Sequence, residues 1–450
     1  MSFPSDTIAA LATPVGTSAI AVVRVSGPLA AELVQKIFGE PPLPRMARHA
    51  DYRDARGLLV DDVLFTYFVA PNSFTAEDTV EISCHGNPFI AQKILEDLLG
   101  RGCRPAEAGE FSKRAFLNGR LDLSQAEAIM DLIHARSEQA LTAANQQLRG
   151  ALGRQMSVLI SRLVNILAQI EAYIDFPDED LPPEDRLVVV RELEELQAGT
   201  SRLLATCHYG ELLRAGIKTV ILGEPNAGKS SLLNRLVGRE RALVSPEPGT
   251  TRDYLEENVL LGPYFLRIID TAGLNPAPTP LEKRSMEKTL EQAGDADIFL
   301  WVIDTTHPLP ALSLALTSRM TTANTIAVFN KIDLPPVERS PLPQPFPIVS
   351  ISALHGAGLD ALQATVTKLA ESFQVKISDD LIAINARHAN SLEQARASLV
   401  AAKDKLEHNS FSELVASDLR SALDAYGQIA GKIDNEQMLD RLFASFCVGK

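Results

Sequence analysis

A glycine-bearing segment, residues 223–230 with the sequence GEPNAGKS, has the residue types and spacing of a phosphate-binding loop. Its glycines let backbone N–H groups turn inward around phosphates, and the helix expected after the loop adds positive potential. We expect the ammonium of Lys229 to reach the β- and γ-phosphates and the hydroxyl of Ser230 to coordinate Mg2+. The alternative, a glycine-rich turn that only packs, is disfavoured because an apolar strand at 218–222 directly precedes the loop.

Two further segments supply groups that such a site needs. The segment IIDTAG at 268–273 ends an apolar strand with Asp270, which can hold Mg2+ through water. It closes with Gly273, whose N–H can sense the γ-phosphate. The segment PGTTRD at 248–253 supplies Thr251, a switch-loop threonine that completes the Mg2+ shell.

The segment NKID at 330–333 predicts which base is bound. The carboxylate of Asp333 can accept from both guanine N1–H and the 2-amino group, a donor pair that adenine lacks. SISAL at 350–354 offers a backbone contact to guanine O6. The sequence therefore predicts a Ras-like domain that binds GTP. The residues expected to contact GTP are Asn226, Ala227, Gly228, Lys229, Ser230, Ser231, Ser245, Pro246, Glu247, Pro248, Gly249, Thr250, Thr251, Asp270, Thr271, Ala272, Gly273, Asn330, Lys331, Asp333, Ser352 and Ala353.

One position departs from the Ras pattern. Ras-type enzymes place a glutamine after the glycine of the D-x-x-G motif to orient the attacking water, and Leu274 stands there. Either another group orients water or the protein is a switch with very slow turnover. Glu282 is the nearest candidate, although its residue type and position alone fit an ordinary surface glutamate better.

The elements that must position these residues alternate in type along the chain. Apolar runs and helical spacing predict mixed α/β structure in 1–119, helices in 120–214, an α/β unit in 215–374 and helices again in 375–450. The predicted fold class is multidomain α/β plus all-α, with a discontinuous helical domain and an inserted Ras-like G domain. The pattern by itself leaves the insertion open.

Composition restricts the function classes. The 450 residues include 43 Lys and Arg against 57 Asp and Glu, a net charge of −14, which excludes a histone-like coat on nucleic acid but not a local tRNA-binding patch. Four scattered cysteines without a C-x-x-C pair argue against a disulfide framework or zinc site. We see no signal peptide and no apolar run of the ~18 residues that span a bilayer, so we expect a cytoplasmic protein without membrane contact.

The motif set resembles the TrmE-Era-Era-like GTPases, and segments outside it narrow the resemblance to the MnmE (TrmE) family over the whole chain. The segments that carry it are FTAED at 74–78, Glu81, CHGNP at 84–88, GEFS at 109–112, RAFLN at 114–118, LDLSQAEA at 121–128 and FCVGK at 446–450. The resemblance implies a GTPase that modifies C5 of the wobble uridine, position 34, of certain tRNAs. It implies an aminomethyl or carboxymethylaminomethyl product and a flavoprotein partner, MnmG (GidA), in a heterotetramer or larger complex.

The resemblance also implies that the N-terminal domain dimerises and holds a tetrahydrofolate derivative, 5-formyl- or methylene-tetrahydrofolate, as the one-carbon donor. The family's folate contacts fall on Arg24, Glu81, Arg120 and Lys450. The family usually has lysine where this chain has Arg120, so geometry changes there while charge is kept. Cys447 is a candidate for direct chemistry, although a free cysteine near a C-terminus is more often passive.

Family resemblance further implies that K+ replaces an arginine finger when two G domains meet. Asn226 matches the potassium ligand, and Ser245, Glu247 and Thr250 occupy the corresponding loop positions. Glu282 matches the glutamate that orients water, which makes it the expected catalytic residue.

Two rivals differ in class. A ribosome-assembly GTPase would carry a KH-type RNA-binding domain after the G domain, but 375–450 has no G-x-x-G loop of that kind. A folate-dependent transferase with a purely structural G domain is disfavoured by the complete guanine and Mg2+ motifs.

Overall fold

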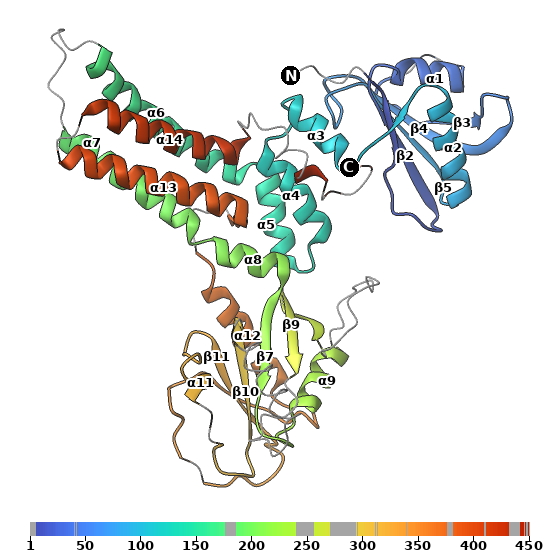
Figure 1. The fold of residues 1–450 in the computed structure, drawn as a ribbon. Helices are drawn as coiled ribbons and strands as arrows, with labels where there is room; N and C mark the ends of the chain where they lie inside the picture. The colour runs from blue at the N-terminus through green and yellow to red at the C-terminus, as the bar shows by residue number, and fades with distance from the viewer. Residues whose placement is uncertain are drawn as a thin grey trace, which may run out of the picture. The chain divides into compact units, whose positions relative to one another are not determined.

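The computed structural model describes residues 6–39, 41, 43–175, 186–239, 256–270, 294, 296–310, 312, 314–338, 340–375, 381–408, 411–431, 442–444, 446 and 449. The chain divides into two compact units, and Figure 1 labels their helices and strands. The first comprises Met1–Met130 with Gly427–Lys450, and the second comprises Asp131–Tyr426.

The first unit is built on a six-stranded sheet in the order β3-β4-β5-β2-β1-β6. Neighbouring strands are antiparallel except β1 and β6, which are parallel. The strands are β1 (Ile8–Leu11), β2 (Ile20–Ser26), β3 (Arg48–Arg53), β4 (Leu59–Phe68), β5 (Thr79–His85) and β6 (Arg104–Pro105), and the helices are α1 (Ala30–Phe38), α2 (Pro88–Gly100) and α3 (Glu110–Leu117).

Buried and less buried side chains alternate along β2, and this alternation shows which face of the sheet forms the core. Ala21, Val23 and Val25 are buried among apolar residues of β4, β5, α1 and α2. Since successive side chains point to opposite faces, Arg24 lies on the other face. The prediction of mixed α/β structure in this region is confirmed by the strands β2, β4 and β5 and the helix α2.

The C-terminal residues belong to this first unit. Phe443 and Phe446 are buried in a cluster with Leu123 and Ala126, which lie on α4 (Leu123–His134). Gly449 has φ +92, and a Cβ there would lie 2.3 Å from the carbonyl oxygen of Leu11. Gly449 is therefore packed directly against β1.

The second unit contains a set of helices and a mostly parallel sheet. Its helices are α5 (Glu138–Leu148), α6 (Ala151–Asp175), α7 (Arg186–Leu204), α8 (Cys207–Ala215), α9 (Lys229–Arg239), α11 (Leu314–Thr317), α12 (Leu359–Ser372), α13 (Ala386–Glu407) and α14 (Ser412–Ala430). Helices from both sides of the sheet region pack together, since Gln197 on α7 donates to the carbonyl of Leu399 on α13 at 3.1 Å. The hydroxyls of Thr200 on α7 and Tyr426 on α14 are hydrogen-bonded at 2.5 Å.

Among the described helices, α6 is long and apolar enough to cross a membrane by length and composition alone. A single helix of this kind is weak evidence for a membrane span, since the core helices of soluble proteins have the same length and composition. Its buried residues Leu159, Leu163, Ile166 and Ile170 recur every three or four positions. This spacing is typical of a helix with one face in a bundle core.

The sheet of the second unit has the order β12-β11-β10-β7-β9-β8, parallel except for the β8–β9 pair. Its strands are β7 (Ile217–Leu222), β8 (Glu256–Leu261), β9 (Tyr264–Asp270), β10 (Ile298–Asp304), β11 (Thr325–Asn330) and β12 (Ile348–Ser350). The central strands are continuous apolar runs because helices cover parallel sheets on both faces. The carboxyl ends of β7, β10 and β11 therefore meet at one edge.

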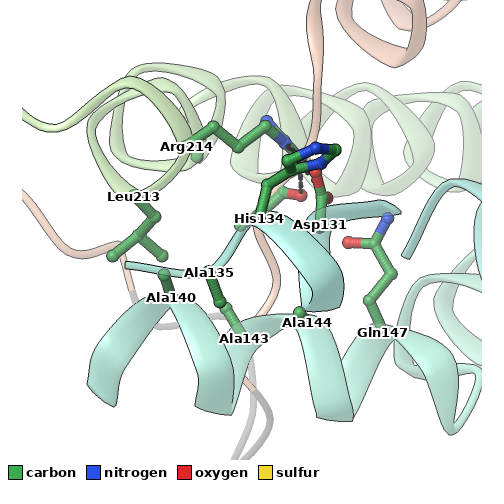
Figure 2. A pocket seen from close by; sticks show the side chains of 11 residues that line it. Asp131, His134, Ala135, Ala140, Ala143, Ala144, Gln147, Leu213 and Arg214 are labelled. Atoms are coloured by element: carbon green, nitrogen blue, oxygen red, sulfur yellow. Dashed lines mark hydrogen bonds and ion pairs between the residues drawn. The ribbon is translucent and has the colours of Figure 1, made fainter. Parts of the chain in front are cut away.

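The chain enters and leaves this sheet region beside one side chain, Arg214 of α8 (Figure 2). Its Nε donates to the Asp131 carboxylate at 3.0 and 3.1 Å, while Nη2 and Nη1 donate to the carbonyls of Ala383 and Ile384 at 3.0 and 3.1 Å. Arg214 and Asp131 line a pocket of about 60 Å³ with a floor of alanines on α5. Arg214 thus links α8, which precedes the sheet region, to residues 383–384, which follow it.

Candidate nucleotide-binding site

The phosphate-binding loop lies between the buried central strand β7 and helix α9, in the predicted strand–loop–helix order. Lys229 is the first residue of α9 and is 6% exposed. Its ammonium donates to the carbonyls of Gly223 and Glu224 at 2.9 and 2.8 Å, so the buried charge is held inside the loop. Ser230 and Ser231 follow in the first turn of α9 and are exposed, where hydroxyls can meet a ligand.

Asn330 connects three of the predicted motifs. Its amide nitrogen donates to the carbonyl of Ala227 at 2.8 Å, and its amide oxygen accepts from the N–H of Ala353 at 2.9 Å. Position 228 next to this contact has no room for a side chain, because a Cβ on Gly228 would lie 2.1 Å from the Asn330 amide nitrogen. Asn330 is 2% exposed, so these are buried hydrogen bonds between the P-loop, the NKID segment and the SISAL segment.

Asp333 and Ser352, two of the residues predicted to contact guanine, lie side by side. The Ser352 hydroxyl donates to the Asp333 carboxylate at 2.5 Å. This hydrogen bond lowers the pKa of Asp333, with smaller help from its own backbone, His355 and Lys331. Arg235 of α9 donates to the carbonyl of Ala353 at 3.1 Å, which is a further contact to the same loop. An ionised Asp333 is the acceptor that guanine recognition requires.

A second group of predicted residues meets in the first unit. Arg24 on β2 and Glu81 on β5 are directly opposed in register, and the Arg24 Nη2–Glu81 Oε1 distance is 2.8 Å. The Arg24 guanidinium lies 5.3 Å from the ring centre of Phe74 and 5.7 Å from that of Phe111. Its Nη1 donates to the carbonyl of Gly449 at 3.2 Å. Gly449 therefore contacts this ion pair.

Comparison with known proteins gives the family. The model of the MnmE helical domain matches residues 123–447, and that of the GTP-binding protein TrmE N-terminus matches 7–120. A tRNA modification GTPase MnmE of Opitutus terrae is 55% identical over 447 residues, covering 99% of both chains. Proteins of the same name from Akkermansia muciniphila and Chlorobium chlorochromatii are 42% and 39% identical, each covering 100% of this chain and 100% and 99% of their own.

The chain belongs to the MnmE family. This confirms the family resemblance of its motifs, which extend through both units. The predicted roles of individual residues remain predictions.

Several predicted contacts of this MnmE-family chain lie outside the described residues. These are Ser245, Pro246, Glu247, Pro248, Gly249, Thr250, Thr251, Thr271, Ala272, Gly273, Glu282, Cys447 and Lys450. Asp270 ends β9, and its carboxylate is likewise outside the described part. Arg120 follows α3 and is exposed, with its N–H donating to the carbonyl of Ala115 at 2.8 Å.

The structure also shows an ionic cluster that sequence reasoning missed. Arg114 on α3 is 2% exposed and pairs with Glu110 at 2.9 Å, Asp6 at 2.8 Å and Glu77 at 3.2 Å. Burial raises the pKa of Glu110, but hydrogen bonds from Arg104, the Glu107 N–H and Arg114 outweigh it, so that the pKa lies below its ordinary value. A glutamate and an arginine four residues apart on one helix were the available signal.

Proposed function

We propose that this MnmE-family chain is a K+-stimulated GTPase that drives modification of C5 of the wobble uridine in certain tRNAs. It is a GTP hydrolase that acts in tRNA modification. The observation that carries the nucleotide assignment is the buried Asn330, which ties the phosphate loop to the guanine-recognition loop.

The nucleotide would lie along the edge where β7, β10 and β11 end. Backbone N–H groups and Lys229 would bind the phosphates, and Asp333 would select guanine. The exposed hydroxyl of Ser230, at the start of α9, fits a Mg2+ ligand, with Thr251 as the second protein group. Bound Mg2+ neutralises phosphate charge in the transition state.

Asn226 supports the proposed potassium sensitivity. This residue lies in the phosphate loop with φ +61 and is exposed, so an amide oxygen is available beside the phosphates. Ser245, Glu247 and Thr250 are proposed as further K+ ligands, and Glu282 is proposed to orient water in place of the missing glutamine. A bound cation supplies the positive charge that an arginine finger provides in other GTPases.

The Arg24–Glu81 pair is proposed as part of a tetrahydrofolate site, with Arg120 and Lys450 as further contacts. A carboxylate suits the paired N–H donors of a pterin, and the adjacent rings of Phe74 and Phe111 offer apolar walls. The folate would donate one carbon to a uridine held by a flavoprotein partner in a complex with a homodimer of this chain.

Reconstitution tests the proposal. The purified chain, the MnmG-type flavoprotein, NADH, a methylene-tetrahydrofolate, an amine donor (ammonium for the aminomethyl product or glycine for the carboxymethylaminomethyl product) and unmodified tRNA are incubated with GTP, and the tRNA nucleosides are measured by mass spectrometry. We expect a C5-modified uridine at position 34 only when GTP is hydrolysed. Modification of equal extent without GTP would favour a transferase with a structural G domain. No modification of any tRNA would contradict the proposal.

A further inference from the structure

The ammonium of Lys331 is bound by a carboxylate outside all the recognised motifs. Lys331 follows the last residue of β11, and Asp304 is the last residue of β10. The two strands are parallel neighbours with Asp304 opposite Asn330 in register. The distance from Lys331 Nζ to Asp304 Oδ2 is 2.6 Å. The ion pair thus lies at the strand edge where the nucleotide would bind.

Asp304 is itself held in place. Its Oδ1 accepts from the N–H and the hydroxyl of Thr306 at 2.9 and 2.8 Å, which leaves Oδ2 for Lys331. His307 also faces Oδ2, at 3.2 Å. The Asp304 side chain is 10% exposed. Burial raises its pKa, but the bonds from Lys331 and Thr306 lower it to about 2, so the carboxylate is charged.

The backbone of Lys331 is constrained as well. It has φ +68, in the left-handed region that a lysine rarely adopts. Its carbonyl accepts from the hydroxyl of Thr305 at 2.9 Å, and the N–H of Thr305 donates to the carbonyl of Asn330 at 3.0 Å. The end of β10 and the turn after it therefore fix both ends of the lysine, the ammonium through Asp304 and the backbone through Thr305.

We propose that Asp304 is a positioning residue for nucleotide binding. It holds the ammonium of Lys331 so that the methylene stem stays beside Asn330 and Asp333, where it can cover the face of a guanine base. This inference rests on the proposed guanine site. A flexible lysine would lose side-chain entropy each time the nucleotide binds, and the ion pair removes part of that cost before binding.

The test uses the full chain and a fluorescent GDP analogue, with dissociation followed by stopped flow. Asp304→Asn keeps the size of the side chain and removes its charge, and Lys331→Met keeps the stem and removes the ammonium. We expect each variant to release nucleotide about fivefold to tenfold faster, the scale of one part-exposed charge-assisted hydrogen bond. Because Asp304 acts through Lys331, the double variant should resemble either single variant rather than show their product.

A control separates positioning from general stability. Asp297 precedes the first residue of β10, and its carboxylate accepts from the N–H of Lys218 at 2.8 Å. Asp297→Asn should alter thermal stability without changing nucleotide release. Multiplicative effects of the two single variants, unchanged release by Asp304→Asn, or tighter binding by it would each overturn the inference. Wild-type protein that fails to bind GDP would instead contradict the nucleotide site itself.

Discussion

Substitution of Asn330 by alanine should weaken both the fold of the second unit and its nucleotide site. The change removes two buried hydrogen bonds, to the carbonyl of Ala227 and from the N–H of Ala353. Both alanines are 2% exposed, so each backbone group would be left without its partner. An unsatisfied buried group costs about 1–3 kcal/mol, which predicts a loss of about 2–6 kcal/mol in the free energy of unfolding.

The single tryptophan of the chain allows this loss in the free energy of unfolding to be measured by fluorescence. Trp301 is 1% exposed on β10 and lies opposite Ala327 of β11, so its fluorescence reports on the sheet that carries Asn330. Urea unfolding of wild type and Asn330→Ala would give the difference in free energy. Asn258→Ala on the edge strand β8 is the matched control, with an expected change below about 0.5 kcal/mol.

Nucleotide affinity should fall together with stability, by more than about tenfold, because the phosphate loop and the guanine loop lose their common partner. An Asn330→Ala variant with the control's stability and wild-type GDP affinity would refute the reasoning, since Asn330 would then not connect the two loops.

Three other predictions concern single groups. Gly228→Ala forces φ +96 on an alanine and sets its Cβ 2.1 Å from the Asn330 amide, so GDP binding measured by anisotropy should fall at least about tenfold; a change within twofold would contradict this. Arg114→Met removes the buried guanidinium shared by Glu110, Asp6 and Glu77 but leaves Arg104 paired with Glu110 and Asp6, so it should cost about 1.5–3 kcal/mol in urea unfolding followed by circular dichroism, whereas a loss under about 1 kcal/mol would show that the cluster is not needed. The folded-state pKa of Glu110 is depressed, so its contribution is full above its ordinary pKa of about 4.3 and is lost as pH falls. The stability gap between wild type and Glu110→Gln should therefore narrow from pH 6 to about pH 3. A constant gap would mean that Glu110 does not titrate as described.

The sequence predicted the elements that local residue types and spacing are enough to identify. Strands β7 and β11 are apolar runs flanked by motif residues, and both occur where expected. The strand β3, with the sequence RHADYR, was not anticipated, because an edge strand exposed to water lacks the apolar alternation on which such predictions depend.

The residues of the nucleotide motifs could be named from spacing, but their connections could not. Asn330 bonds to Ala227, 103 positions away, and the contact depends on which strands are neighbours in the sheet. The same holds for Arg24 and Glu81, 57 positions apart, which meet because β2 and β5 pair in one register. Asp304 carries no motif signal at all, and only the parallel pairing of β10 with β11 places it beside Lys331.

Hydrolysis of GTP by the purified chain in KCl and in NaCl at equal ionic strength, with Glu282→Ala alongside, tests the central claim most directly. We predict strong stimulation by potassium that the variant loses, because K+ and Glu282 are proposed to replace the arginine finger and glutamine of other GTPases. Equal rates in the two salts would contradict the potassium site at Asn226, and a fully active variant would contradict the role of Glu282.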